Sequence, residues 1–422
     1  MKKIHGFACL GALLLAAGTL AGCGPSYDMT LNVWVAKNIK DLTQQQAKVW
    51  AAGIKETTGK NIGVKVTAVG EGEAAGNMIT DVQKGADIYG FAQDQLARLR
   101  SSGALTTIVD PNLKAEIIAA NDADSVAAAS VGDELVAYPM TSDNGYFMYY
   151  DKSLFPDESV LTDLEAMFPV LRQAGRSLYF NAQSSAWYNA AFFHAFGARS
   201  LWTTNDQGLF TSYDDNYNSE AGIKACTAIY NLVNTNKDVF VDNSEAGSAF
   251  KEDASGKLAA GALVSGTWDY AAAKAALGEN LGAIELPYVT VGEERVHLGS
   301  FKGFKLMGVK QQKDPERAAY AQLLAKYLTS KDCQLQRFEQ FGWGPSNVEA
   351  QQDERVLANV ALTALRNQNA YALEQGQYPG DWWTGASNIS KSLAAETCKG
   401  TRAEIVAILR TYEATVDTYV NG

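Results

Sequence analysis

The stretch LNVWVAKNIKDLTQQQAKVWAAGIKETTGKNIGVKVTAVG, residues 31–70, decides the fold. Residues 31–36 form a short apolar run, which is typical of a strand buried on both faces. Residues 64–68 alternate apolar and polar side chains, as a second strand does. Between them, four apolar residues recur at helical spacing: Leu42, Val49, Trp50 and Ile54. A strand, a helix and a strand in this order predict a parallel sheet, and hence an α/β fold.

The same alternation continues along the chain. Further strands are predicted at residues 87–89, 135–138, 147–150, 177–180, 262–264, 283–286 and 304–309. Helices are predicted at about residues 74–84, in a segment ending at Gly103, and at residues 401–420. The 422 residues suggest two or three lobes, at a prior of about 150 residues each. Since no Pro-rich linker or repeat is present, short crossings are expected to join the lobes.

Composition excludes several classes of protein. The chain has 36 Lys plus Arg against 47 Asp plus Glu, a net charge of -11, and no basic run, so no nucleic acid is expected as a partner. Three His and no Cys-x-x-Cys motif provide no signature of a metal site, and no cofactor is expected. Five Cys are too few for a disulfide framework, and whether Cys333 and Cys398 pair stays open.

The N-terminus predicts where the protein is located. Residues 1–22 combine Lys2 and Lys3 with a short apolar stretch, which is typical of a secretory signal peptide. The sequence LAGC, residues 20–23, resembles the bacterial lipobox, and this resemblance implies that Cys23 is lipidated and that residues 23–26 are a tether. Two acyl chains hold a protein stably at a membrane surface. We therefore expect a lipid-anchored protein on the extracytoplasmic face of the cell membrane.

Two local motifs point to other functions and fail, and a third function has no motif at all. Residues 70–75, GEGEAA, follow a strand as a dinucleotide fingerprint does, but Glu71 and Glu73 would repel a pyrophosphate. Residues 214–218 begin like a calcium loop, yet the Gly at its sixth position and the Glu at its twelfth are absent. Paired carboxylates of a glycoside hydrolase carry no local signature in this chain. An enzyme is therefore not expected.

Aromatic residues carry the stronger functional signal. Most of them lie at or just beyond the ends of predicted strands: Trp34, Phe91, Trp187, Trp268, Trp382 and Trp383. Ligands of open α/β sheets bind outside the carboxyl ends of strands, and aromatic faces there suit the apolar faces of sugar rings. Trp34 and Trp50 are expected in the core instead. As a set, the aromatic residues predict a sugar-binding cleft.

These features resemble a known family, the extracellular solute-binding lipoproteins of ABC sugar importers, which includes maltodextrin-binding proteins. The resemblance covers the whole chain after Cys23, and five segments carry it: LNVWV at 31–35, GADIYGFAQD at 85–94, GDELVAYP at 132–139, SGTW at 265–268 and GFKL at 303–306. It implies a two-lobe periplasmic-binding-protein-like fold of type II. Each lobe would be a mostly parallel sheet flanked by helices, with the ligand cleft between the lobes.

The resemblance also implies domain boundaries. Three crossings would fall near Asp143, Lys302 and Asn347. Lobe one would then contain residues 27–142 and 303–346. Lobe two would contain residues 143–302 and 347–422.

Site residues follow from the resemblance as well. Phe91 would be an aromatic at the cleft edge, Asp94 a carboxylate that accepts sugar hydroxyls, and Asp143 an acid at the first crossing. Asn38 occupies a polar position after the first strand, whereas Gln95 replaces a residue that is commonly basic. Three residues would stack on sugar rings: Trp187, Trp268 and Trp383, with Trp382 as the rival of the last.

The function implied is capture of an oligosaccharide of the maltodextrin type, followed by delivery to the membrane subunits of an ABC transporter. The protein would act as a monomer and close its lobes about the crossings. The alternatives left open are another sugar or polyol as ligand, a surface glycoside hydrolase, and a lipoprotein of adhesion or assembly.

Overall fold

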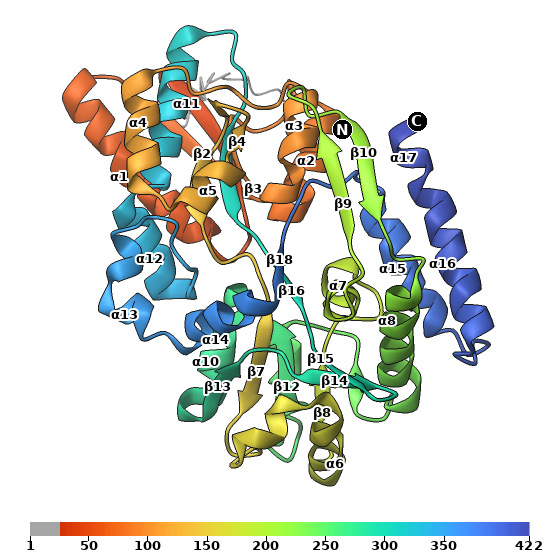
Figure 1. Ribbon diagram of the computed structural model, residues 1–422. Coiled ribbons are helices and arrows are strands. Elements are labelled where there is room, and N and C mark those ends of the chain that lie inside the picture. Colours follow the sequence, from red (N-terminus) through yellow and green to blue (C-terminus); the bar gives the residue numbers. More distant parts are fainter. Residues whose placement is uncertain (1–25, 422) are drawn as a thin grey trace, which may run out of the picture.

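The computed structural model describes residues 26–421, which form two sheet-centred lobes (Figure 1). The expected signal peptide and the lipidation site Cys23 lie outside these residues. Among residues 26–421, no helix is both long and apolar enough to cross a membrane.

Lobe one is built on a five-stranded sheet in the order β2-β1-β3-β17-β6. Its strands are β1 (Met29–Val35), β2 (Ile62–Ala68), β3 (Ile88–Ala92), β6 (Tyr138–Thr141) and β17 (Lys305–Val309). β1 pairs in parallel with β2 and β3, and α1 (Lys40–Thr58) connects β1 to β2, so the predicted βαβ unit is confirmed. The α1 helix ends at Gly59, whose φ of 75° suits a residue without Cβ.

Lobe two is built on a second five-stranded sheet, in the order β11-β8-β12-β7-β13. Its strands are β7 (Phe147–Asp151), β8 (Ser177–Tyr179), β11 (Phe240–Val241), β12 (Ala260–Ser265) and β13 (Leu281–Ile284). Both faces of β7 and β12 are buried, which explains their continuous apolar sequences.

Each sheet is mixed, with two parallel and two antiparallel strand pairings, so half of the pairings are parallel, and not most of them as the resemblance implied. The reason is the direction in which the chain enters. β17 starts directly after the chain crosses from lobe two, and β7 starts directly after it crosses from lobe one. β17 therefore begins at the edge of its sheet where β3 ends, and runs antiparallel to β3. In the other sheet, β7 begins where β12 ends, and runs antiparallel to β12.

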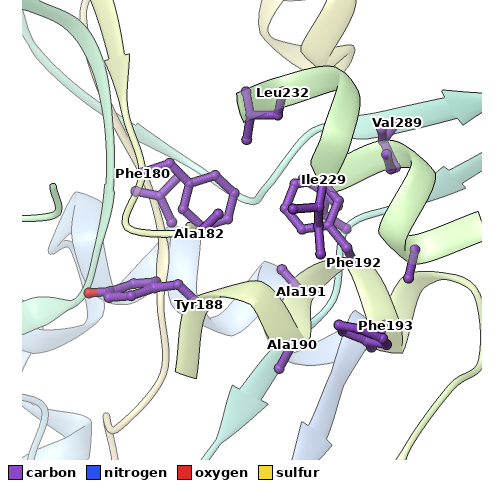
Figure 2. Packing of buried hydrophobic residues seen from close by; sticks show 14 of the residues in the cluster. Phe180, Ala182, Tyr188, Ala190, Ala191, Phe192, Phe193, Ile229, Leu232 and Val289 are labelled. Carbon is purple, nitrogen blue, oxygen red and sulfur yellow. The ribbon is translucent and has the colours of Figure 1, made fainter. Parts of the chain in front are cut away.

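Helices flank both sheets (Figure 1). Besides α1, the longer ones in lobe one are α2 (Glu71–Thr80), α4 (Pro111–Ala120) and α11 (Pro315–Leu328). Those in lobe two are α6 (Leu164–Ala174), α7 (Ala186–Ala195), α8 (Glu220–Tyr230), α14 (Val360–Gln368), α15 (Trp382–Leu393) and α16 (Arg402–Val416). α12 (Lys331–Phe341) packs Phe338 into lobe two and bonds to Gln46 of α1 through the carbonyl of Cys333. Figure 2 shows how Phe192 of α7 packs beside Ile229 of α8 in the lobe two core.

Short elements complete the molecule. α3 (Leu96–Ser101), α5 (Ala123–Ala128), β4 (Ser130–Val131) and β5 (Glu134–Leu135) lie in lobe one; α9 (Ala246–Ala249), α10 (Tyr270–Leu277), α13 (Glu354–Leu357) and α17 (Thr418–Asn421) follow later in the chain. Two hairpins that the sequence analysis does not predict are β9–β10 (Ser200–Thr204 and Phe210–Asp215) and β14–β15 (Tyr288–Val291 and Glu294–His297). The strands β16 (Ser300–Lys302) and β18 (Ala372–Glu374) pair in parallel between the lobes (Figure 1).

Candidate ligand-binding cleft

A cavity of about 1120 Å³ lies between the two lobes. On the side of lobe one, it is lined by the segments that follow β1, β2 and β3. On the side of lobe two, it is lined by the segment after β12 and by residues at the start of α7 and α15. The carboxyl ends of β1, β3 and β12 therefore face this space, where open α/β sheets bind their ligands. Five of the expected site residues line the cavity: Asn38, Asp94, Trp187, Trp268 and Trp383.

Asp94 is the buried acid of this cleft. It lies in the single turn Gln93–Gln95 that follows β3, and the side-chain amide of Gln95 donates to its carboxylate. Burial raises the pKa of Asp94 to about 7, although hydrogen bonds from Gln95 and Trp383 and the charge of Arg98 act in the opposite direction. In its ionised form, Asp94 gains stability from any further hydrogen-bond donor that enters the cleft.

Trp187 and Trp383 form an aromatic wall on the side of lobe two. The ring of Trp187 is stacked on Phe301, with centroids 4.8 Å apart and planes at 21°, and Trp383 lies 6.2 Å from Trp187. Phe301 therefore covers one face of Trp187. Trp382, the rival of Trp383, is fully buried and donates its indole N–H to Tyr412. Of this pair, Trp383 is the residue that lines the cleft.

Trp268 reaches the cleft from the turn after β12. Its ring lies against Gly266, where an added Cβ would come within 2.3 Å of the Cη2 atom of Trp268. A residue other than Gly at position 266 would displace this ring. The ammonium group of Lys305 lies 5.1 Å from the centroid of the Trp268 ring.

Two expected site residues do not line the cleft. Phe91 lies inside β3, which extends beyond the predicted residues 87–89, and its ring is fully buried in the core beside Tyr89. Asp143 is 1% exposed, and its Oδ2 accepts hydrogen bonds from Thr267 Oγ1 at 2.5 Å and from the backbone N–H of Gly344 at 2.6 Å. Asp143 therefore lies at the first crossing, as the resemblance implied, but its carboxylate is engaged by the protein itself.

Sequence reasoning missed several residues of the cleft. Lys305 and Trp343 line it from β17 and from the segment after α12. Lys305 belongs to the GFKL segment, but no binding role was expected for it. Glu71, considered above only as part of a nucleotide fingerprint, opens α2 and faces the cleft. Burial raises the pKa of Glu71, whereas the charge of Lys305 lowers it. A signal that could have found Glu71 is its place at the carboxyl end of a predicted strand.

The charges around the cleft are nearly balanced. The basic residues are Lys37, Arg98 and Lys305, and the acidic ones are Glu71, Asp94, Glu245 and Asp269. Within residues 26–421, no group of three or more His, Cys, Asp or Glu side chains is placed to hold a metal ion. Aromatic faces together with donors and acceptors of both signs suit a neutral ligand that is rich in hydroxyl groups.

Several solved structures share this fold. The maltose/maltodextrin-binding domain of Bdellovibrio bacteriovorus, bound to maltotriose, is 19% identical with a TM-score of 0.74 and covers 92% of this chain and 100% of its own. The GacH receptor of Streptomyces glaucescens, solved unliganded and with acarbose, is 17% identical with a TM-score of 0.73 and covers 93% and 99%. The maltodextrin-binding protein of L. casei is 19% identical with a TM-score of 0.70 and covers 91% and 98%. These likenesses establish the two-lobe fold.

Sequence comparison identifies the family. No curated protein sequence matches the chain. Residues 50–364, however, match the family model of the bacterial extracellular solute-binding proteins, which are binding proteins that act outside the cytoplasm. Because this match spans more than half of the chain, the protein is a member of the bacterial extracellular solute-binding protein family.

Proposed function

We propose that the protein binds an oligosaccharide of the maltodextrin type outside the cytoplasm and delivers it to the membrane subunits of an ABC transporter. The observation that carries this proposal is the arrangement of one cleft, in which Trp187, Trp268 and Trp383 accompany the polar side chains Asn38 and Asp94. Indole rings pack on the apolar faces of sugar rings, and carboxylates and amides bond to the hydroxyl groups at their edges. The solved relatives that hold maltotriose or acarbose support the same ligand class.

The proposed mechanism is hinge closure. Asn38 and Asp94 belong to lobe one, and Trp187 and Trp383 belong to lobe two, so one ligand would contact both lobes. Only a ligand that binds the closed form more tightly shifts the equilibrium towards closure. Periplasmic binding proteins close about short hinges in this way. The closed form would then be the form that the transporter recognises.

The finer expectations remain parts of this proposal. The lobe boundaries after residues 142, 302 and 346 are supported by the sheets, because the strands of each sheet fall within the residues assigned to its lobe. Lipid anchoring through Cys23 would keep the protein close to the transporter. The protein would act there as a monomer without a cofactor.

Small-angle X-ray scattering of residues 26–422, with and without saturating maltotriose, tests the closure. We expect a smaller radius of gyration with the sugar present, and intact maltotriose when the sample is recovered and separated by chromatography. Glucose or maltose in that sample would indicate a glycoside hydrolase. If the radius of gyration is unchanged with maltotriose, cellotriose and xylotriose, closure on these sugars is refuted. The protein would then be a lipoprotein of adhesion or assembly, or a binding protein for a different ligand.

A further inference from the structure

One ion pair lies at the point where the chain crosses between the lobes. Asp143 is on the first crossing, between β6 and β7, and Lys305 begins β17 directly after the second. Lys305 Nζ is 3.6 Å from Asp143 Oδ1, and the two side chains are 5% and 0% exposed. The carboxylate of Asp143 also accepts hydrogen bonds from Thr267, in the loop that carries Trp268, and from Gly344, in the segment after α12.

Besides its ion pair with Asp143, the ammonium group of Lys305 contacts two aromatic rings. Its Nζ lies 4.0 Å from the ring centroid of Trp343 and 5.1 Å from that of Trp268. Within residues 26–421, this nitrogen has no hydrogen-bond partner. A desolvated cation is attracted to the electron-rich faces of indole rings, so the contact orients the rings as well as the cation. Two other charged groups interact electrostatically with the pair: Arg337 with Asp143, and Glu71 with both Lys305 and Asp143.

We propose that Lys305 is a positioning residue of the cleft: held by Asp143, it keeps the ring of Trp268 in the orientation in which that ring meets the ligand. This inference rests on the proposed function, because Trp268 is one of the rings that would stack on the sugar. It assigns Asp143 to the hinge and not to the ligand. Trp268 is then oriented by two contacts, one with Gly266 and one with Lys305.

The binding test compares two buried lysines, Lys305 at the start of β17 and Lys310 directly after its end. Lys310, directly after the far end of β17, is also buried, but its Nζ donates to the carbonyls of Gln83 and Gly85, away from the cleft. We expect Lys305→Met to weaken maltotriose binding about tenfold in isothermal titration calorimetry, whereas Lys310→Met changes the Kd by less than about twofold. Both substitutions are expected to lower the midpoint of urea unfolding.

The double variant Lys305→Met/Asp143→Asn covers the case in which Lys305→Met alone fails to fold. It removes both charges, and the amide oxygen introduced at position 143 would still accept from Thr267 and Gly344. We expect it to unfold at a higher urea concentration than Lys305→Met and to bind maltotriose as weakly. Wild-type affinity in either folded variant overturns the proposal.

A ligand-free measurement separates this proposal from the proposed function. In a Trp343→Phe background, Lys305→Met should shift the tryptophan emission maximum, and the further substitution Trp268→Phe should abolish that shift. If wild-type protein does not bind maltotriose, the proposed function fails for that sugar. The fluorescence measurement needs no sugar, and it still tests whether Lys305 positions Trp268. A shift of the same size with and without Trp268 contradicts the positioning role.

Discussion

Replacing Trp187 by Ala should weaken sugar binding by an amount that follows from its packing. Phe301 covers one face of the indole ring, so only the other face is available to a ligand. One face is about 80 Å², roughly half of the ~150 Å² that an aromatic side chain can bury. At about 25 cal/mol per Å², its loss costs about 2 kcal/mol, or roughly a 30-fold higher Kd.

Isothermal titration calorimetry with maltotriose measures this loss, and calorimetric melting confirms that the variant is folded. Trp202→Ala is the matched control, because Trp202 is an equally large, buried residue of the same lobe that does not line the cleft. Trp202→Ala should lower the melting temperature and leave the Kd unchanged. Trp187→Phe should fall between wild type and Trp187→Ala. If folded Trp187→Ala binds maltotriose as tightly as wild type, the stacking argument is wrong.

Three further predictions concern stability and reactivity. Because the pKa of Asp94 is raised to about 7 in the folded protein, the folded state keeps this proton to higher pH than the unfolded chain does, so its contribution to the free energy of unfolding falls between about pH 4 and pH 7. Urea titrations across that range should show this fall in wild type but not in Asp94→Asn. Asp87, 2% exposed, binds Arg317 through two hydrogen bonds and accepts from the backbone of Asn32; Asp87→Ala should therefore cost about 3–5 kcal/mol in the same assay, and a cost below about 1 kcal/mol would contradict this. Ellman's reagent should label no thiol of folded residues 26–422 and three in urea, since all three are buried and unpaired: Cys226, Cys333 and Cys398.

The elements that sequence predicts well are those with long periodic patterns. α1 and its flanking strands carry enough apolar residues at the right spacing to be located within a few residues. β16 and β18 have three residues each, too few for any pattern. The β9–β10 hairpin escapes prediction because its strands are largely exposed and carry many polar side chains.

The cleft could be predicted only where a residue follows a recognisable segment. Asp94 and Trp268 come shortly after strands, and the structure places both at the cleft. The prediction for Phe91 is wrong because β3 continues to Ala92 instead of ending at residue 89, which puts the Phe91 side chain into the core. Lys305 meets Asp143 only through the crossing of two distant segments, a contact that no local pattern encodes.

The most direct test of the central claim is calorimetric titration of residues 26–422 with α- and β-linked gluco-, galacto- and xylo-oligosaccharides. We predict micromolar or tighter binding to the α-linked gluco-oligosaccharides, with the sugar recovered intact. Heats no larger than dilution across the whole panel would contradict the assignment of this cleft to an oligosaccharide.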